Sequence, residues 1–130
     1  MCKSALYAAN TGTQAVAAGM PISFGTVVRR FGQYLNLSGG TVVAEGAGYY
    51  DVIANLTFVA DTAGEVNVSL YKDGMAIPGA TISVPGTAGI EYAVTIPAII
   101  RNKCCCDTSF TAKADVNITL VNAAIAVKKI

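Results

Sequence analysis

Residues 48–58 read GYYDVIANLTF, and the alternation within this stretch decides the fold class. Every second residue from position 50 to position 58 is apolar, and the polar Asp51, Asn55 and Thr57 fall between them. Successive side chains of a β-strand point to opposite faces of the sheet, whereas the apolar face of a helix repeats every three to four residues. The stretch therefore predicts a half-buried strand.

The same alternation continues on the C-terminal side. Residues 65–72 alternate again, and the dipeptide Asp73-Gly74 that follows is typical of a tight hairpin turn. A return strand is predicted from Met75, with an interruption at Pro78-Gly79. Further strands are predicted over residues 4–9, 26–31, 90–96, 116–121 and 123–127.

Turn residues separate these strands along the whole chain, and helical periodicity is almost absent. About eight to ten short strands, with turn signals roughly every 8 to 12 residues, predict an all-β sandwich or barrel. The strand at 90–96 is expected to end before Pro97, because proline cannot donate to a central ladder. A length of 130 residues is that of one domain, so residues 1–130 are predicted to form a single domain.

The composition points to an assembly. Hydrophobic residues make up 53% of the chain and charged residues only 13%, about half the usual charged share of a soluble domain. A monomer with so few charges would leave apolar surface in water, and monomers rarely expose large contiguous apolar patches. Interfaces between subunits, which remove a further face from solvent, are the simplest explanation.

The charge pattern argues against nucleic acid and membrane partners. The net charge is +1, and the nine Lys and Arg residues are scattered, so electrostatic capture of nucleic acid is not predicted. No run approaches the ~20 apolar residues that a membrane helix requires, so no membrane insertion is predicted. The first residues also lack the apolar segment of a secretory signal, so export, if it happens, is expected to use cell lysis, another secretion route or a segment outside this sequence.

Catalytic and metal-binding residues are poorly supplied. The chain has no histidine, and its eight carboxylates are dispersed along it, which leaves no paired acid and base at a recognisable spacing. We predict that the protein is not an enzyme, has no cofactor and has no metal ligands.

The four cysteines form an unusual pattern, Cys2 and the run Cys104, Cys105 and Cys106. Neighbouring residues of a strand point to opposite faces, so bonds between adjacent cysteines would be strained. Three interpretations stay open: a structural or incidental role, disulfides between subunits or to Cys2, and a thiolate-rich metal site. The cationic Arg101 and Lys103 favour the thiolate form, so reactive thiols in this run are a separate expectation.

Residues 48–58, followed by residues 68–74, resemble the globular C1q and tumour necrosis factor-like superfamily. In that family a Gly-x-Tyr strand leads, after a short connection, into a strand that ends in a Lys-Asn/Asp-Gly hairpin. Residues 21–24 and the polar turn at 36–40 stand where the early strands and crossing loop of the family would be. The resemblance covers most of residues 20 to 80.

The resemblance implies an antiparallel jelly-roll sandwich of about ten strands that assembles as a compact homotrimer, with one apolar sheet of each subunit facing the threefold axis. Candidates for the trimer interface or the core are then Tyr49, Tyr50, Ile53, Phe58, Val59, Ala124 and Ile125. Two features depart from the family pattern. No collagen-like stalk precedes residue 4, and the cysteine run matches nothing in the family.

Two functions are compatible with these features. The first is a structural or recognition protein of a bacteriophage particle, such as a head fibre, capsid decoration or tail-tip component, assembled in the host cytoplasm. Its exposed loops would bind other virion proteins or a carbohydrate or protein on the host surface. The alternative is a trimeric adhesion module of a bacterial cell or spore surface. The candidate loops are residues 11–19, 36–40, 61–64, 85–89 and 102–109.

Overall fold

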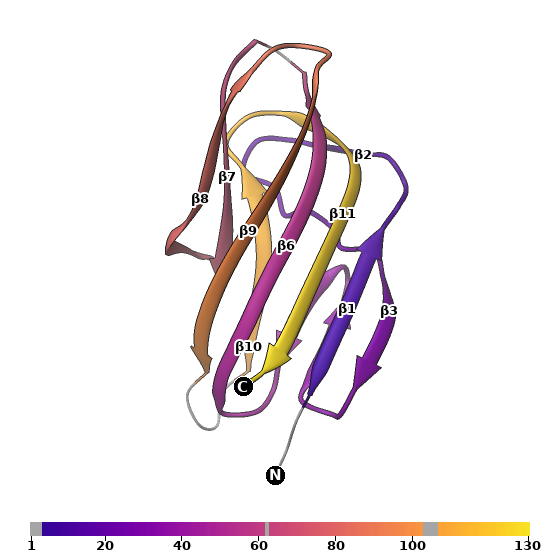
Figure 1. Cartoon of the computed structure of the whole chain (residues 1–130), viewed down its shortest axis with the longest axis vertical. Coiled ribbons are helices and arrows are strands. Elements are labelled where there is room, and N and C mark those ends of the chain that lie inside the picture. Colours follow the sequence, from indigo (N-terminus) through magenta and orange to yellow (C-terminus); the bar gives the residue numbers. More distant parts are fainter. Residues whose placement is uncertain (1–3, 62, 103–106) are drawn as a thin grey trace.

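The computed structural model describes residues 4–61, 63–102 and 107–130, which form a sandwich of two antiparallel sheets (Figure 1). The strands in chain order are β1 (Ala5–Asn10), β2 (Gln14–Val16), β3 (Thr26–Phe31), β4 (Leu35–Ser38), β5 (Thr41–Ala44), β6 (Gly48–Ala60), β7 (Gly64–Lys72), β8 (Met75–Gly86), β9 (Glu91–Asn102), β10 (Thr108–Ala114) and β11 (Ile118–Lys129). The predicted all-β jelly roll is confirmed, with eleven strands among the described residues where about ten were expected. Across these ranges, no helix has the length and hydrophobicity needed to cross a membrane.

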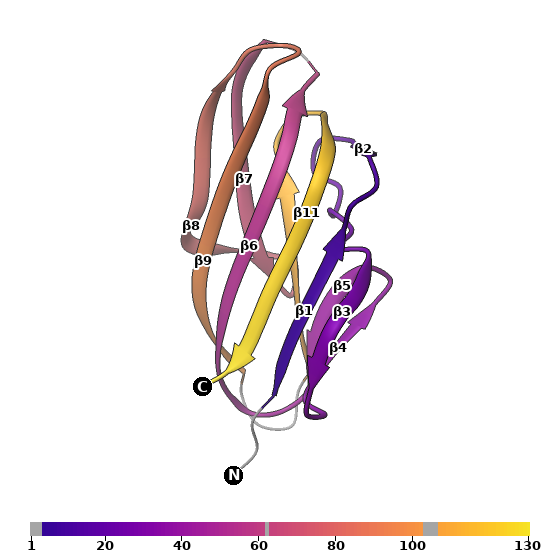
Figure 2. The same cartoon turned by 45° about the vertical axis from the view of Figure 1, so that its right-hand side comes forward.

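The two layers can be followed in Figure 2. Sheet A has the order β3-β1-β11-β6-β9, and the short β2 pairs with β11 beside this path. Sheet B has the order β4-β5-β10-β7-β8. Because β1 and β11 pair along their whole shared length, the first and last strands lie together in the middle of sheet A.

The core fills the space between the sheets. The side chains at even positions from Tyr50 to Ala60 in β6 are buried, and they face buried side chains of β7 and β10 such as Val68 and Phe110. The rings of Tyr50 and Phe110 lie 6.4 Å apart at a tilt of 56°. Each such side chain contributes about 1.5–3 kcal/mol when it is fully buried. The alternation that predicted the strand therefore also builds the core.

The predicted hairpin is confirmed at Asp73 and Gly74, which connect β7 and β8. Their φ angles are 51° and 84°, and two positive values in succession are the geometry of the turn that matches strand twist. The predicted interruption at Pro78-Gly79 is a β-bulge: the pairing of β7 with β8 shifts between Ser69 and Tyr71, and the strand continues to Gly86.

Two predicted strand boundaries were wrong. β9 does not stop before Pro97 but runs through it to Asn102, because β9 is the edge of sheet A and an edge strand tolerates a missing donor. The two strands predicted at the C-terminal end form the single strand β11. A bulge between Leu120 and Asn122 absorbs the break in the alternation.

Candidate functional site

The outer face of sheet B is polar, and several of its described side chains hydrogen bond to one another, although the buried hydroxyl of Thr111 has no partner among the described residues. The hydroxyl groups of Ser69 and Thr81 are hydrogen bonded at 2.8 Å. The Asn67 side-chain amide donates to a carboxylate oxygen of Asp115 at 2.8 Å, and the backbone N–H of Asn67 donates to the other at 2.9 Å. These bonds to Asn67 lower the pKa of Asp115 below its ordinary value. A face of this kind is suited to water.

The outer face of sheet A is different, because the half that contains the start of β1 and the end of β11 carries a cluster of apolar side chains. The strand register places two rows of side chains across this half. One row contains Phe31, Ala5, Lys128, Asp51 and Ile99. The next row contains Arg29, Tyr7, Ala126, Ile53 and Pro97. We name the seven uncharged members of these rows the apolar patch.

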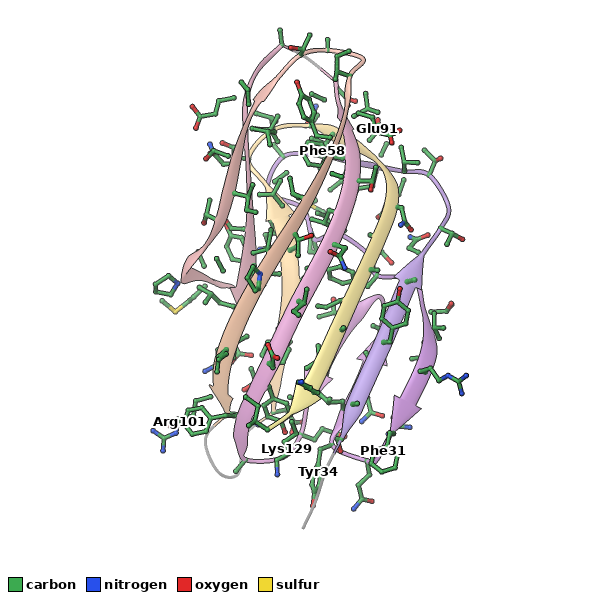
Figure 3. The ribbon with its side chains drawn as sticks, in the orientation of Figure 1. Phe31, Tyr34, Phe58, Glu91, Arg101 and Lys129 are labelled. Atoms are coloured by element: carbon green, nitrogen blue, oxygen red, sulfur yellow. The ribbon has the colours of Figure 1, made fainter. Side chains whose placement is uncertain are left out.

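Four large side chains of the apolar patch are open to solvent. The exposed fraction is 66% for both Phe31 and Ile99, 41% for Tyr7 and 36% for Ile53. The other half of the same face is polar. Thr95 donates a hydrogen bond to Asn55 at 2.7 Å, and Thr119 donates one to Asp61 at 2.9 Å. In Figure 3, Glu91 lies at this polar end, and Phe31, Arg101 and Lys129 lie at the opposite end.

A hollow of about 380 Å³ opens on the apolar patch. Ala5 on β1 and Ala126 on β11 lie in adjacent rows, and the larger side chains of Tyr7, Phe31 and Ile53 surround them. Because alanine carries only a methyl group, these two positions leave a gap in the surface. The charged groups at its border include Lys128 and Asp51, whose ion pair is long, at 3.9 Å, and partly exposed. The hollow is thus an apolar depression with a charged border.

The structure separates the predicted interface or core residues into two groups. Tyr50, Phe58 and Ile125 are fully buried between the sheets. Tyr49, Ile53, Val59 and Ala124 belong to the outer face of sheet A, where Ala124 is nevertheless almost fully covered. Sequence reasoning missed the other members of the apolar patch, Ala5, Tyr7, Phe31, Pro97, Ile99 and Ala126. Their grouping depends on the order of strands in sheet A, for which the sequence carries no signal.

The candidate loops do not form one surface. The connections after β6 and β8 meet at one end of the sandwich, where the Gly89 N–H donates to the Ala60 carbonyl at 3.3 Å. Asn102 lies at the other end, and residues 36–40 include part of β4. Residues 11–19 include β2. The candidate loops therefore lie at more than one place on the sandwich, and two of the ranges include residues of short strands.

Cys2, Cys104, Cys105 and Cys106 lie outside the described residues. Residues 4–61, 63–102 and 107–130 contain no group of three His, Cys, Asp or Glu side chains that could hold a metal ion.

A buried polar cluster holds the end of the sandwich beside the apolar patch. The Tyr50 hydroxyl donates to the Gly46 carbonyl at 2.5 Å, and the Asn102 side-chain amide donates to the same carbonyl at 3.0 Å. Thr108 donates to the Asn102 side-chain oxygen at 2.5 Å. The cluster joins the end of β9, the start of β10 and the loop before β6, so it fixes the strands that carry the patch.

We expect Tyr50 to make folding sensitive to alkali. Burial raises the pKa of Tyr50 above its ordinary value of 10.0. A raised pKa means that the unfolded chain releases this proton first, so the contribution of Tyr50 to stability is complete below about pH 10 and is lost as the pH rises through the folded value. Urea unfolding from about pH 8 to pH 11 should show a steeper loss of stability in the wild type than in Tyr50→Phe.

The Phe variant keeps the ring in the core and removes only the hydroxyl. It should lose about 1 kcal/mol at neutral pH, since the Gly46 carbonyl keeps its bond from Asn102. Parallel pH profiles for the two proteins would contradict a role for Tyr50 ionisation.

Comparisons with known proteins place this architecture among solved jelly rolls. Eiger TNF from S. frugiperda superposes with a TM-score of 0.69 at 13% identity, covering 98% of this chain and 91% of that one. The globular domain of zebrafish complement 1qA protein gives a TM-score of 0.68 at 12% identity, covering 98% and 97%. PRD1 vertex protein P5 gives a TM-score of 0.60 at 18% identity, covering 100% and 99%.

No protein-family model matches the sequence. No curated protein matches it either. At these low identities the likeness is one of fold, and the fold is the jelly roll of TNF and of the C1q globular domain, as the motifs in residues 48–74 predicted.

Proposed function

We propose that this chain is a structural protein of a bacteriophage particle, folded as one domain, which forms a compact homotrimer through the outer face of sheet A. The observation that carries the proposal is the contrast between the two outer faces. The apolar patch leaves four large side chains in water, whereas the outer face of sheet B is polar and internally hydrogen bonded. Contacts of the patch with further copies would remove from water the apolar surface that a chain with so few charged residues leaves exposed.

The likeness to PRD1 vertex protein P5 supports a role in a particle. The homotrimer is also what the C1q and TNF-like resemblance of residues 48–74 implies. In this assembly the apolar sheets lie around the threefold axis, and the polar outer faces of sheet B point away from it. The partners would be other virion proteins or a carbohydrate or protein on the host surface, and no catalytic role is proposed.

Native mass spectrometry of the purified protein tests the assembly. We expect a species of three times the 13.3 kDa chain mass over a wide range of concentration. The same mass with and without reductant would assign the association to noncovalent contacts and not to the cysteines. A monomer at all concentrations would overturn the proposal.

The location needs a second experiment. Antibodies raised against the folded protein should label purified phage particles from a lysate of the source organism. Labelling of cell or spore envelopes in place of particles would favour the adhesion module, and the particle assignment would then be wrong.

A further inference from the structure

The two sides of the apolar patch have opposite shapes. On the side of β1 and β11, the small Ala5 and Ala126 leave the hollow of about 380 Å³. On the other side, the edge strand β9 projects Ile99, one of the two most exposed of the four large side chains of the patch. A single face therefore carries both a depression and a projection of the same apolar character.

The register places the two features at the same height along the strands. Ile99 pairs with Asp51, and the same row continues through Lys128 to Ala5. A pure rotation about an axis along the strands keeps every residue at its height, so it can bring Ile99 of one copy to the hollow of the next. When one patch of a subunit binds a different patch of the next, the subunits form a closed ring only if the rotation between neighbours divides a full turn evenly and involves no shift along the axis. Otherwise they form a filament.

A twofold contact whose axis runs along the strands also sets each projection against the hollow of the other copy, because such a contact pairs unlike residues reciprocally. The number of copies therefore comes from the homotrimer proposed above, in which each hollow is filled by a side chain of the neighbouring copy. Ile99 has no polar atom in its side chain, so its burial over two alanine methyl groups leaves no hydrogen bond unmade.

We propose that the hollow over Ala5 and Ala126 receives Ile99 of the next subunit, so that each copy gives one such contact and receives one. This proposal rests on the homotrimer proposed above and names the element of the second copy that occupies the hollow. It sets the direction in which subunits follow one another around the axis.

Photocross-linking tests the pairing without disturbing the cysteines. The photoreactive p-benzoyl-phenylalanine replaces Ile99, and equal amounts of ¹⁴N and ¹⁵N protein are mixed, reassembled and irradiated. We expect covalent pairs in which the tryptic peptide of residues 73–101 of one isotope is joined to residues 4–29 or 114–128 of the other. Those two peptides contain Ala5 and Ala126. An intact trimer that gives no covalent pair, or that joins residue 99 to another peptide of the second copy, would overturn the pairing.

Filling the hollow is an independent test. Ala126→Phe should weaken the trimer roughly tenfold or more, because the added ring occupies the space of Ile99 at the centre of the contact. The matched control is Ala93→Phe, on the polar half of the same face, where Ala93 is exposed and pairs with Thr57. We expect the control to assemble like the wild type.

The outcomes separate this proposal from the one on which it rests. A wild-type protein that is monomeric means that the homotrimer itself is wrong. A trimeric wild type with an equally stable Ala126→Phe trimer means that the assembly is right and the occupant of the hollow is wrong. A foreign protein or small molecule in the hollow would produce this second result.

Discussion

Ile53→Asp is expected to turn the trimer into a folded monomer. Ile53 lies in the apolar patch with 36% of its surface exposed, so an aspartate there stays hydrated in a single chain. In the assembly the same carboxylate would lose its water among apolar side chains and would face its own copies around the axis. We expect association to weaken about a hundredfold or more, since an unpaired buried charge costs several kcal/mol.

Sedimentation velocity gives the mass, and far-ultraviolet circular dichroism reports whether the strands are intact. Val43→Asp is the matched control, because Val43 is a half-buried apolar residue on β5 that pairs with Asn36 and Ser109. The polar outer face of sheet B is not part of the proposed interface, so this variant should stay trimeric. A trimer of unchanged stability for Ile53→Asp would remove sheet A from the interface.

Ile125→Asp should abolish folding altogether. Ile125 lies one row from Ile53 but on the other face of sheet A, where it pairs with Ala54 and is completely buried. The change removes buried apolar volume, at a cost of about 2–5 kcal/mol, and adds the cost of a carboxylate without a partner. Together these losses approach the whole stability of a small domain, about 5–15 kcal/mol. We expect insoluble protein or an unfolded spectrum.

A milder substitution keeps this prediction quantitative. Ile125→Ala should fold and assemble, with a free energy of unfolding lowered by about 2–4 kcal/mol in urea titration. Native-like stability of either Ile125 variant would mean that this side chain is not in the core. The same substitution, isoleucine to aspartate, is thus expected to give a folded monomer at position 53 and an unfolded chain at position 125.

The sequence was sufficient for the longer strands, because alternation and turn residues are local signals, but β2, β4, β5 and β10 were not among the predicted strands. The strand at residues 48–58 and the hairpin at Asp73-Gly74 are examples, since each depends on neighbouring residues only. The strand end predicted before Pro97 was wrong because the effect of a proline depends on whether its strand is central or at an edge. Strand order is a property of the whole sheet and is not visible in the local sequence.

The apolar patch was harder to predict. In β11 the buried positions change from even, at Ile118 and Leu120, to odd, at Ala123 and Ile125, because the bulge inserts one residue. Counting every second residue across that point assigns side chains to the wrong face. The hollow needs Ala5 and Ala126 in adjacent rows of the same face, and only the pairing of β1 with β11 brings them close together.

The position of β11 between β1 and β6 has a consequence for biosynthesis. A ribosome releases β1 to β10 before β11, so the gap between β1 and β6 stays open until β11 has been synthesised. Pairing of segments so distant in the chain is slow, and the incomplete sheet would expose its edges meanwhile. Chains that lack β11 should therefore be unable to present the surface on which neighbouring copies assemble, which restricts incorporation to chains in which β11 has been synthesised.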